Sequence, residues 1–136
     1  MLHAELSRSE IEHRRMLTEK TCNMVIRALG IREVDNDCIL TMYREFFLQI
    51  SFSEVHPLMV FCLARLLENY DMTSIDACND MNMNSVLGSH VINEEASVYH
   101  YRATHWLECE LTKERFFEIL NRCTDEAVKG YFHLVT

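Results

Sequence analysis

The first thirty residues carry the hydrophobic pattern of an amphipathic helix. From about Glu5 to Leu29, apolar residues such as Ile11, Cys22 and Val25 recur close to one face, and polar residues occupy the remainder. Gly30 follows at the position where a helix usually ends in the left-handed conformation. The pattern therefore predicts a long helix that ends at Gly30.

Residues 31–54 change to a pattern typical of strands. Their content of β-branched and aromatic residues is high, and Asp35–Asp37 and Arg44–Glu45 are suited to turns. The last part alternates between apolar and polar residues, the period of a half-buried strand. The alternating positions are Leu48, Gln49, Ile50, Ser51, Phe52 and Ser53. The segment predicts a three-stranded antiparallel meander.

Two helices are predicted after the meander. Pro57 suits a first helical turn, where its missing N–H has no partner in any case. The run that follows is apolar nearly all round, so the pattern predicts a buried central helix over about Pro57–Asn69. A shorter helix is predicted from about Ile75 to Met83, with Thr73 or Ser74 as its cap.

A hairpin is predicted from Val86–Ile92 and Ser97–Leu107, with residues 93–96 as its turn. Successive side chains of a strand point to opposite faces. One face of the second arm therefore carries Val98, His100, Arg102, Thr104 and Trp106, and the other carries Tyr99, Tyr101, Ala103, His105 and Leu107. His100 and His105 point to opposite sides of the sheet and cannot easily share a metal ion.

The chain closes with a third well-marked helical pattern. Thr112 is suited to cap this helix, and Leu111 can pack onto Phe116 across its first turn. Gly130 is predicted to end it, which leaves residues 131–136 as an extended tail.

Together these elements predict one α+β domain over residues 1–136. An antiparallel sheet, made of a three-stranded meander plus a C-terminal hairpin, packs against N-terminal, central and C-terminal helices. The chain has one proline and three glycines, so no flexible linker divides it.

Composition and charge exclude several classes of partner. The formal net charge is −8, which disfavours nucleic acid because phosphates require a basic surface. The longest apolar run is too short to span a bilayer, so no membrane contact is expected. Six cysteines occur without a Cys-x-x-Cys pair, and no leader precedes the first helix. The expected location is therefore the cytoplasm, where the six cysteines are expected to be reduced and to act as small core residues.

No motif in the sequence carries catalytic or metal-binding chemistry. A zinc site needs about four nitrogen or sulfur ligands at suitable spacing, and the nearest pair, His105 and Cys109, lacks further partners. No nucleophile elbow or glycine-rich phosphate loop is present. The sequence predicts a protein that is not an enzyme and that holds no metal or cofactor.

Aromatic residues of the second hairpin arm are the candidate protein-binding residues. In a two-layer fold one sheet face is open, and either Val98 and Trp106 or Tyr99 and Tyr101 must lie on it. An exposed apolar patch marks protein contacts more often than chemistry. Tyr99, Tyr101, Trp106 and Val98 are therefore predicted to bind protein.

The order of elements resembles the YbjN-like family and the class I type III secretion chaperones of the CesT type. The matching segments are "FFLQISFSEVHP", "IDACNDMNMNSVLGSHVINEEASVYHYRATHWL" and "ELTKERFFEILNRC". Together they lie between about residues 30 and 125. The resemblance implies an acidic, cytoplasmic, non-enzymatic homodimer.

Members of the chaperone group bind an extended segment of a secreted partner, and YbjN-like members have accessory roles. The expected function is therefore a chaperone-like or regulatory module that binds an extended segment of a partner protein, such as a secreted effector. A second hypothesis is a small ligand-sensing or enzymatic domain with a pocket near His100 or His105.

Overall fold

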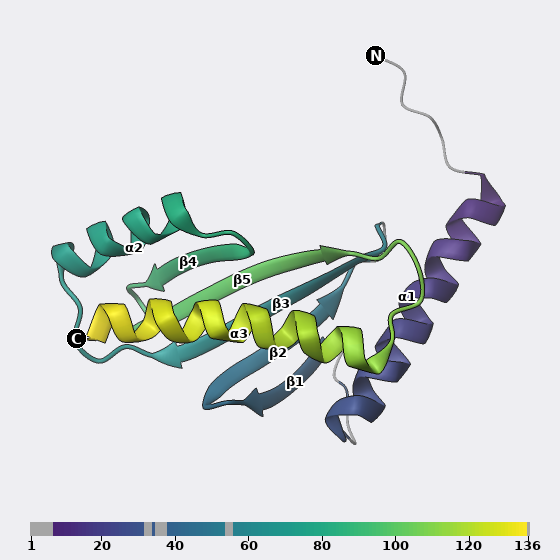
Figure 1. The fold of residues 1–136 in the computed structure, drawn as a ribbon, viewed down its shortest axis with the longest axis horizontal. Helices are drawn as coiled ribbons and strands as arrows, with labels where there is room; N and C mark the ends of the chain where they lie inside the picture. The colour runs from purple at the N-terminus through teal and green to yellow at the C-terminus, as the bar shows by residue number, and fades with distance from the viewer. Residues whose placement is uncertain (1–6, 32–33, 35–37, 54–55, 136) are drawn as a thin grey trace, which may run out of the picture.

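The structure is a computed structural model that describes residues 7–31, 34, 38–53 and 56–135. Within these residues the chain forms an α+β fold in which three helices pack on a five-stranded sheet (Figure 1). The elements in chain order are α1 (Arg8–Leu29), β1 (Cys38–Tyr43), β2 (Phe46–Phe52), β3 (Leu58–Leu66), α2 (Met72–Asn84), β4 (Gly88–Asn93), β5 (Val98–Trp106) and α3 (Lys113–Val135).

The sheet is antiparallel throughout, with the strand order β1-β2-β3-β5-β4. β3 is therefore the central strand, and β1 and β4 are the two edges. α3 runs along one face of the sheet, while α2 lies beside β4 at one edge (Figure 1). The predicted α+β class with an antiparallel sheet is confirmed.

The hydrophobic core lies between the sheet and α3, with the C-terminal part of α1 closing one end. Alternate residues of each strand point into this core, as the strand period requires. α3 contributes one apolar face with helical spacing. The core includes Val25, Ile39, Phe46, Leu48, Ile50, Met59, Phe61, Leu63, Tyr99, Tyr101, Phe116, Leu120, Ala127 and Leu134.

The first helix confirms the prediction, although Glu5 lies outside the described residues. Ser7 caps α1 because its side chain accepts a hydrogen bond from the backbone N–H of Glu10. Gly30 ends α1 with φ +66°, and the Gly30 and Ile31 amides bind carbonyls of the last turn. The N-terminal half of α1 extends away from the sheet (Figure 1).

Two strands of the predicted meander are confirmed as β1 and β2. Arg44 and Glu45 form the turn between them, with φ values of +47° and +69°, so the turn is of the type I′ class. Arg44 pairs with Asp125 of α3 at 2.9 Å and Glu45 with Arg65 of β3 at 3.4 Å. The first predicted strand and the Asp35–Asp37 turn fall largely outside the described residues, and Ile31 and Val34 belong to no strand.

The predicted central helix over Pro57–Asn69 is wrong, because this segment forms β3. Met59, Phe61 and Leu63 point into the core, while Leu58, Val60, Cys62 and Ala64 occupy the opposite face. Both faces of β3 are apolar although the helices cover only one of them, and this conceals the period of two on which strand prediction depends. Pro57 instead precedes the strand, where its carbonyl accepts a hydrogen bond from the Leu107 amide at 2.6 Å.

The remaining elements confirm the predictions except at their ends. α2 begins one turn earlier than expected, since Asp71 and Ser74 form its capping box. The hairpin of β4 and β5 is confirmed. The extended tail after Gly130 is wrong, because α3 continues to Val135. Gly130 lies in the helix where a Cβ would approach within 2.5 Å of His90 Nδ1, so glycine permits close packing rather than helix termination.

Candidate functional site: the bare face and the two edges of the sheet

One face of the sheet carries none of the three helices, and we call it the bare face. It carries the strand positions that alternate with the core positions. Phe47, Leu66 and Leu40 are about 60% exposed there, and Trp106 is 48% exposed. The apolar members of the bare face include Leu40, Met42, Phe47, Leu58, Val60, Cys62, Ala64, Leu66, Val91, Val98 and Trp106. Exposed apolar residues that gather on one face of a protein are typical of a contact site.

A row of directly paired residues, apolar except for His100, crosses the bare face from one edge to the other. Met42 pairs with Phe47 and Phe47 with Ala64, so three adjacent strands place apolar side chains side by side. The row continues through His100 of β5 to Val91 of β4. Directly paired positions lie about 5 Å apart, so these side chains form one surface.

The sequence-predicted residues divide between the two faces. Val98 and Trp106 lie on the bare face, as one of the two alternatives predicted. Tyr99 and Tyr101 are fully buried, so the prediction that they offer an exposed contact surface is corrected. The cause is α3, which covers their face of β5. Burial raises the pKa of both phenols far above the ordinary value, so they act as neutral hydrogen-bonding groups.

The two histidines considered as pocket residues also divide. His100 lies on the bare face, where its Nδ1 is 3.5 Å from the Cys62 thiol. His105 lies on the opposite face. Its pKa is lowered mainly by burial and also by the positive charge of the nearby Arg115. The structure therefore does not bring them into one site.

The histidine that does join a network is His90 of β4, which the sequence pattern did not single out. His90 is buried, and its Nδ1 lies 2.5 Å from the hydroxyl of Tyr99. Burial lowers the pKa of His90, opposed by the charge of Glu126. A buried histidine on a short strand resembles any polar residue in sequence, so only the position of α3 reveals it.

Glu126 of α3 organises the second half of this network. Its Oε1 accepts hydrogen bonds from Tyr101 at 2.7 Å, from Ser85 at 2.5 Å and from the Gly88 amide at 3.1 Å. Burial opposes ionisation, but these donors outweigh it, and the pKa of Glu126 is lowered. A carboxylate with this many donors is a structural acceptor rather than a catalytic base.

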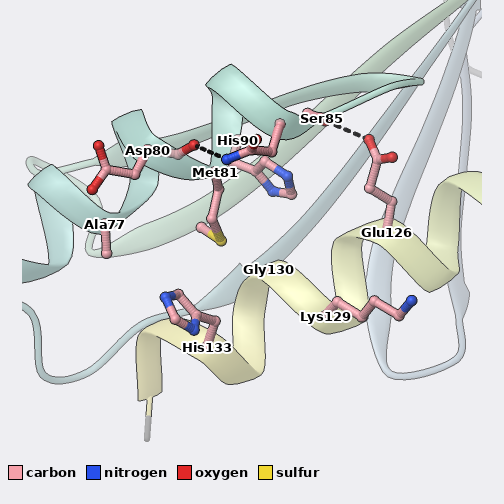
Figure 2. Close-up of a pocket in the computed structure, with 10 residues that line it drawn as sticks. Ala77, Asp80, Met81, Ser85, His90, Glu126, Lys129, Gly130 and His133 are labelled. Carbon is pink, nitrogen blue, oxygen red and sulfur yellow. Dashed lines mark hydrogen bonds between the residues drawn. The ribbon is translucent and has the colours of Figure 1, made fainter.

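A cleft of about 520 Å³ opens between α2 and α3 beside His90. Figure 2 shows Asp80 and Met81 on the α2 side and Lys129 and His133 on the α3 side. Opposite charges are spread along its walls and do not converge on one point. Among the described residues, no group of three or more histidine, cysteine, aspartate or glutamate side chains is placed to hold a metal ion.

The backbone of β4 is closed by side chains on its outer side. Asn82 of α2 accepts a hydrogen bond from the His90 amide at 2.6 Å and donates one to the His90 carbonyl at 2.8 Å. The Gly88 carbonyl accepts a hydrogen bond from Ser85, and the Gly88 amide donates to Glu126. These contacts replace the hydrogen bonds that a neighbouring strand would make.

The β1 edge is open by comparison. In a two-residue hairpin the residues beside the turn exchange hydrogen bonds, so Tyr43 and Thr41 face β2, while Met42 and Leu40 direct their backbone groups outward. Within the described part of the chain, no side chain binds these groups as Asn82 binds His90. β1 also contains no charged residue or proline, the features that usually block an edge.

Burial raises the pKa of three of the cysteine thiols, Cys62, Cys78 and Cys123. Cys78 and Cys123 are buried, as expected for core residues, whereas Cys109 is exposed. Burial and the neighbouring Glu126 raise the pKa of Cys123 to about 11. Burial also raises the pKa of Cys62, opposed by Arg102. A raised pKa keeps a thiol protonated and weakly nucleophilic.

Comparisons with known proteins bear on the fold. No family model and no curated protein matches the chain. Among solved structures, a chain of the HopA1–SchA chaperone–effector complex matches with a TM-score of 0.57. The two chains share the fold. The match covers 93% of this chain and 98% of the other at 10% identity, so it establishes the fold alone. The YbjN-like resemblance has no such support.

None of the helices in the described ranges combines the length and apolar character needed to cross a membrane.

Proposed function

We propose that this protein is a non-enzymatic, chaperone-like module that binds an extended segment of a partner protein. The observation that carries the proposal is the set of exposed apolar residues on the bare face, which reaches the backbone edge of β1 at Leu40 and Met42. Its fold, shared with a chain of a chaperone–effector complex, supports this class of function. A secreted effector is the proposed partner.

The geometry favours a partner segment that adds as a sixth strand beside β1. The outward backbone groups of Leu40 and Met42 supply the hydrogen bonds, which recognise any extended chain. β1 has six residues and spans about 20 Å, so a segment of comparable length fits it. Side chains of that segment on the bare side would extend the apolar row of Met42 and Phe47.

Val98 and Trp106 belong to the proposed contact surface at the β5 end of the bare face. Trp106 lies against His56, with ring centroids 5.7 Å apart, and pairs with Leu58 of β3. Tryptophan buries a large area with little loss of side-chain freedom and often anchors an interface. We propose that the partner chain continues across the sheet to this residue.

A second copy of the chain is also proposed as a partner, at a different place. Met83 and Val86 are 85% exposed, and Leu87 beside them is 44% exposed, at the corner between α2 and β4. This corner lies at the opposite edge from β1, so a homodimer formed there leaves the proposed binding edge free (Figure 1). Sedimentation at several concentrations tests the homodimer, and a monomer at high micromolar concentration would contradict it.

The test of the binding surface compares charged substitutions at equally apolar, exposed positions. Phe47→Glu and Met42→Glu place a carboxylate in the apolar row, and we expect both to release the partner that co-purifies with the wild-type protein. Met16→Glu is the matched control, because Met16 is exposed to a similar degree as Met42 but lies on α1, outside both proposed contact surfaces. Retention of the partner by Phe47→Glu and Met42→Glu, with circular dichroism of all three variants unchanged, would refute the proposed surface.

A further inference from the structure

The two edge strands of the sheet both lack charged residues and proline, but they differ in how open they are to pairing. β4 reads GSHVIN and β1 reads CILTMY, and neither contains a charged side chain or a proline. Uncharged edge strands are templates for pairing with another chain unless something covers them. In β4 the covering is supplied by Asn82, Ser85 and Glu126, which lie on α2, the following loop and α3.

Asn82 reproduces the contact of a neighbouring strand. Its amide group presents one acceptor and one donor to the same residue, His90, as the backbone of an antiparallel partner does. The position of His90 is also fixed on the core side of the sheet. Its ring binds the Tyr99 hydroxyl and packs closely against Gly130. The outward backbone groups of Gly88 and His90 are therefore satisfied without a sixth strand.

We propose that Asn82, with Ser85 and Glu126, is an autoinhibitory contact that keeps β4 from pairing with the β4 strand of a second copy. A second copy is the occupant that the strand itself indicates. Two β4 strands related by a two-fold axis meet antiparallel, and the absence of charge in β4 removes the like-charge repulsion that would oppose them. The contact concerns backbone pairing of β4 alone, so it is compatible with a homodimer formed through the side chains of Met83, Val86 and Leu87. It leaves β1 as the edge available for pairing, and it stands whether or not β1 binds an effector.

Hydrogen exchange of the wild-type protein tests the closed edge without any substitution. The amides of Gly88 and His90 should exchange at least about tenfold more slowly than those of Leu40 and Met42, although both pairs face outward from edge strands. Equal exchange rates at the two edges would overturn the proposal, because β4 would then be as open as β1.

Substitution of Asn82 tests whether loss of this contact allows β4 to pair with a second copy. Asn82→Leu keeps the size of the side chain and removes both hydrogen bonds, so we expect faster exchange at His90 and a rise in sedimenting mass above that of the wild type. Asn84→Leu is the matched control, because the Asn84 amide binds the Asp80 carbonyl within α2. Its mass should remain that of the wild type.

Ser85→Ala is a milder variant that keeps the test decisive if Asn82→Leu folds poorly. It removes the hydroxyl that binds the Gly88 carbonyl, and a smaller increase of the same kind in mass and exchange is expected. Wild-type mass for every variant that circular dichroism shows to be folded would overturn the autoinhibitory role.

Discussion

The two faces of the sheet contain similar residues but have opposite roles. On β3, Leu63 is fully buried beneath the helices, whereas Leu66, three residues later, is 59% exposed on the bare face. On β2, likewise, Leu48 is buried and the neighbouring Phe47 is exposed on the bare face. Hydrophobic character alone therefore does not define the core of this protein. The direction of each side chain relative to α3 decides which apolar residues stabilise the fold and which remain available to a partner.

The largest expected effect separates the two leucines of β3. Leu63→Ala removes a fully buried side chain and should lower the free energy of unfolding by about 2–5 kcal/mol. Leu66→Ala shortens an exposed side chain and should change it by less than about 0.5 kcal/mol. Urea denaturation of both variants checks this. Similar losses in the two would show that the bare face is covered within the chain itself.

The second-largest expected effect tests how closely α3 approaches the face of the sheet that it covers. In most helix interiors glycine is about 1 kcal/mol less favourable than alanine. Gly130→Ala should instead destabilise the protein by about 1–3 kcal/mol, because the new methyl group would meet His90 and Tyr99. Lys129→Ala, one position earlier on an exposed part of α3, is the control and should have little effect. A stabilised Gly130→Ala variant would disprove the close contact.

Acid should weaken the covered face and leave the bare face unchanged. Burial lowers the pKa of His90 in the folded state below its ordinary value of 6.5, so the unfolded chain binds the proton more readily. The stability that His90 contributes is complete above that pH and is lost as pH falls through the folded pKa. Glu126 adds a second loss below its ordinary value of 4.5, because its folded pKa is also lowered.

Thermal unfolding across this pH range measures both losses. His90→Gln should reduce the loss that begins below pH 6.5 and leave the one due to Glu126. His105 must be compared with His90 in the same experiment, because its pKa is also lowered and it would lose stability in the same pH range. A stability that is independent of pH between 7 and 5, in wild type and His90→Gln alike, would contradict the account of the buried network.

The alternation along β5 could be predicted from the sequence, but the covered face could not. The period of two correctly separates Tyr99 and Tyr101 from Val98 and Trp106. Both sets contain aromatic residues, however, so only the position of α3 shows which set is buried. The choice between the two faces depends on tertiary packing, which the alternation along a single strand does not contain.

The open edge escaped prediction for a related reason. β3 is apolar on both faces, and its sequence fits a buried helix as well as a central strand. Without β3 as the central strand, the sequence pattern cannot indicate that β1 is an edge. The uncharged stretch from Cys38 to Tyr43 was the available signal, but its meaning depends on the strand order.

The central claim is that a partner segment pairs with β1 and covers the bare face, and hydrogen exchange of the purified complex tests it most directly. On binding, the amides of Leu40 and Met42 should become protected, since they direct their N–H groups outward in the free protein. The amides of Gly88 and His90, already bonded by Glu126 and Asn82, should change little. Protection confined to α2 and β4, with β1 exchanging as in the free protein, would contradict the account.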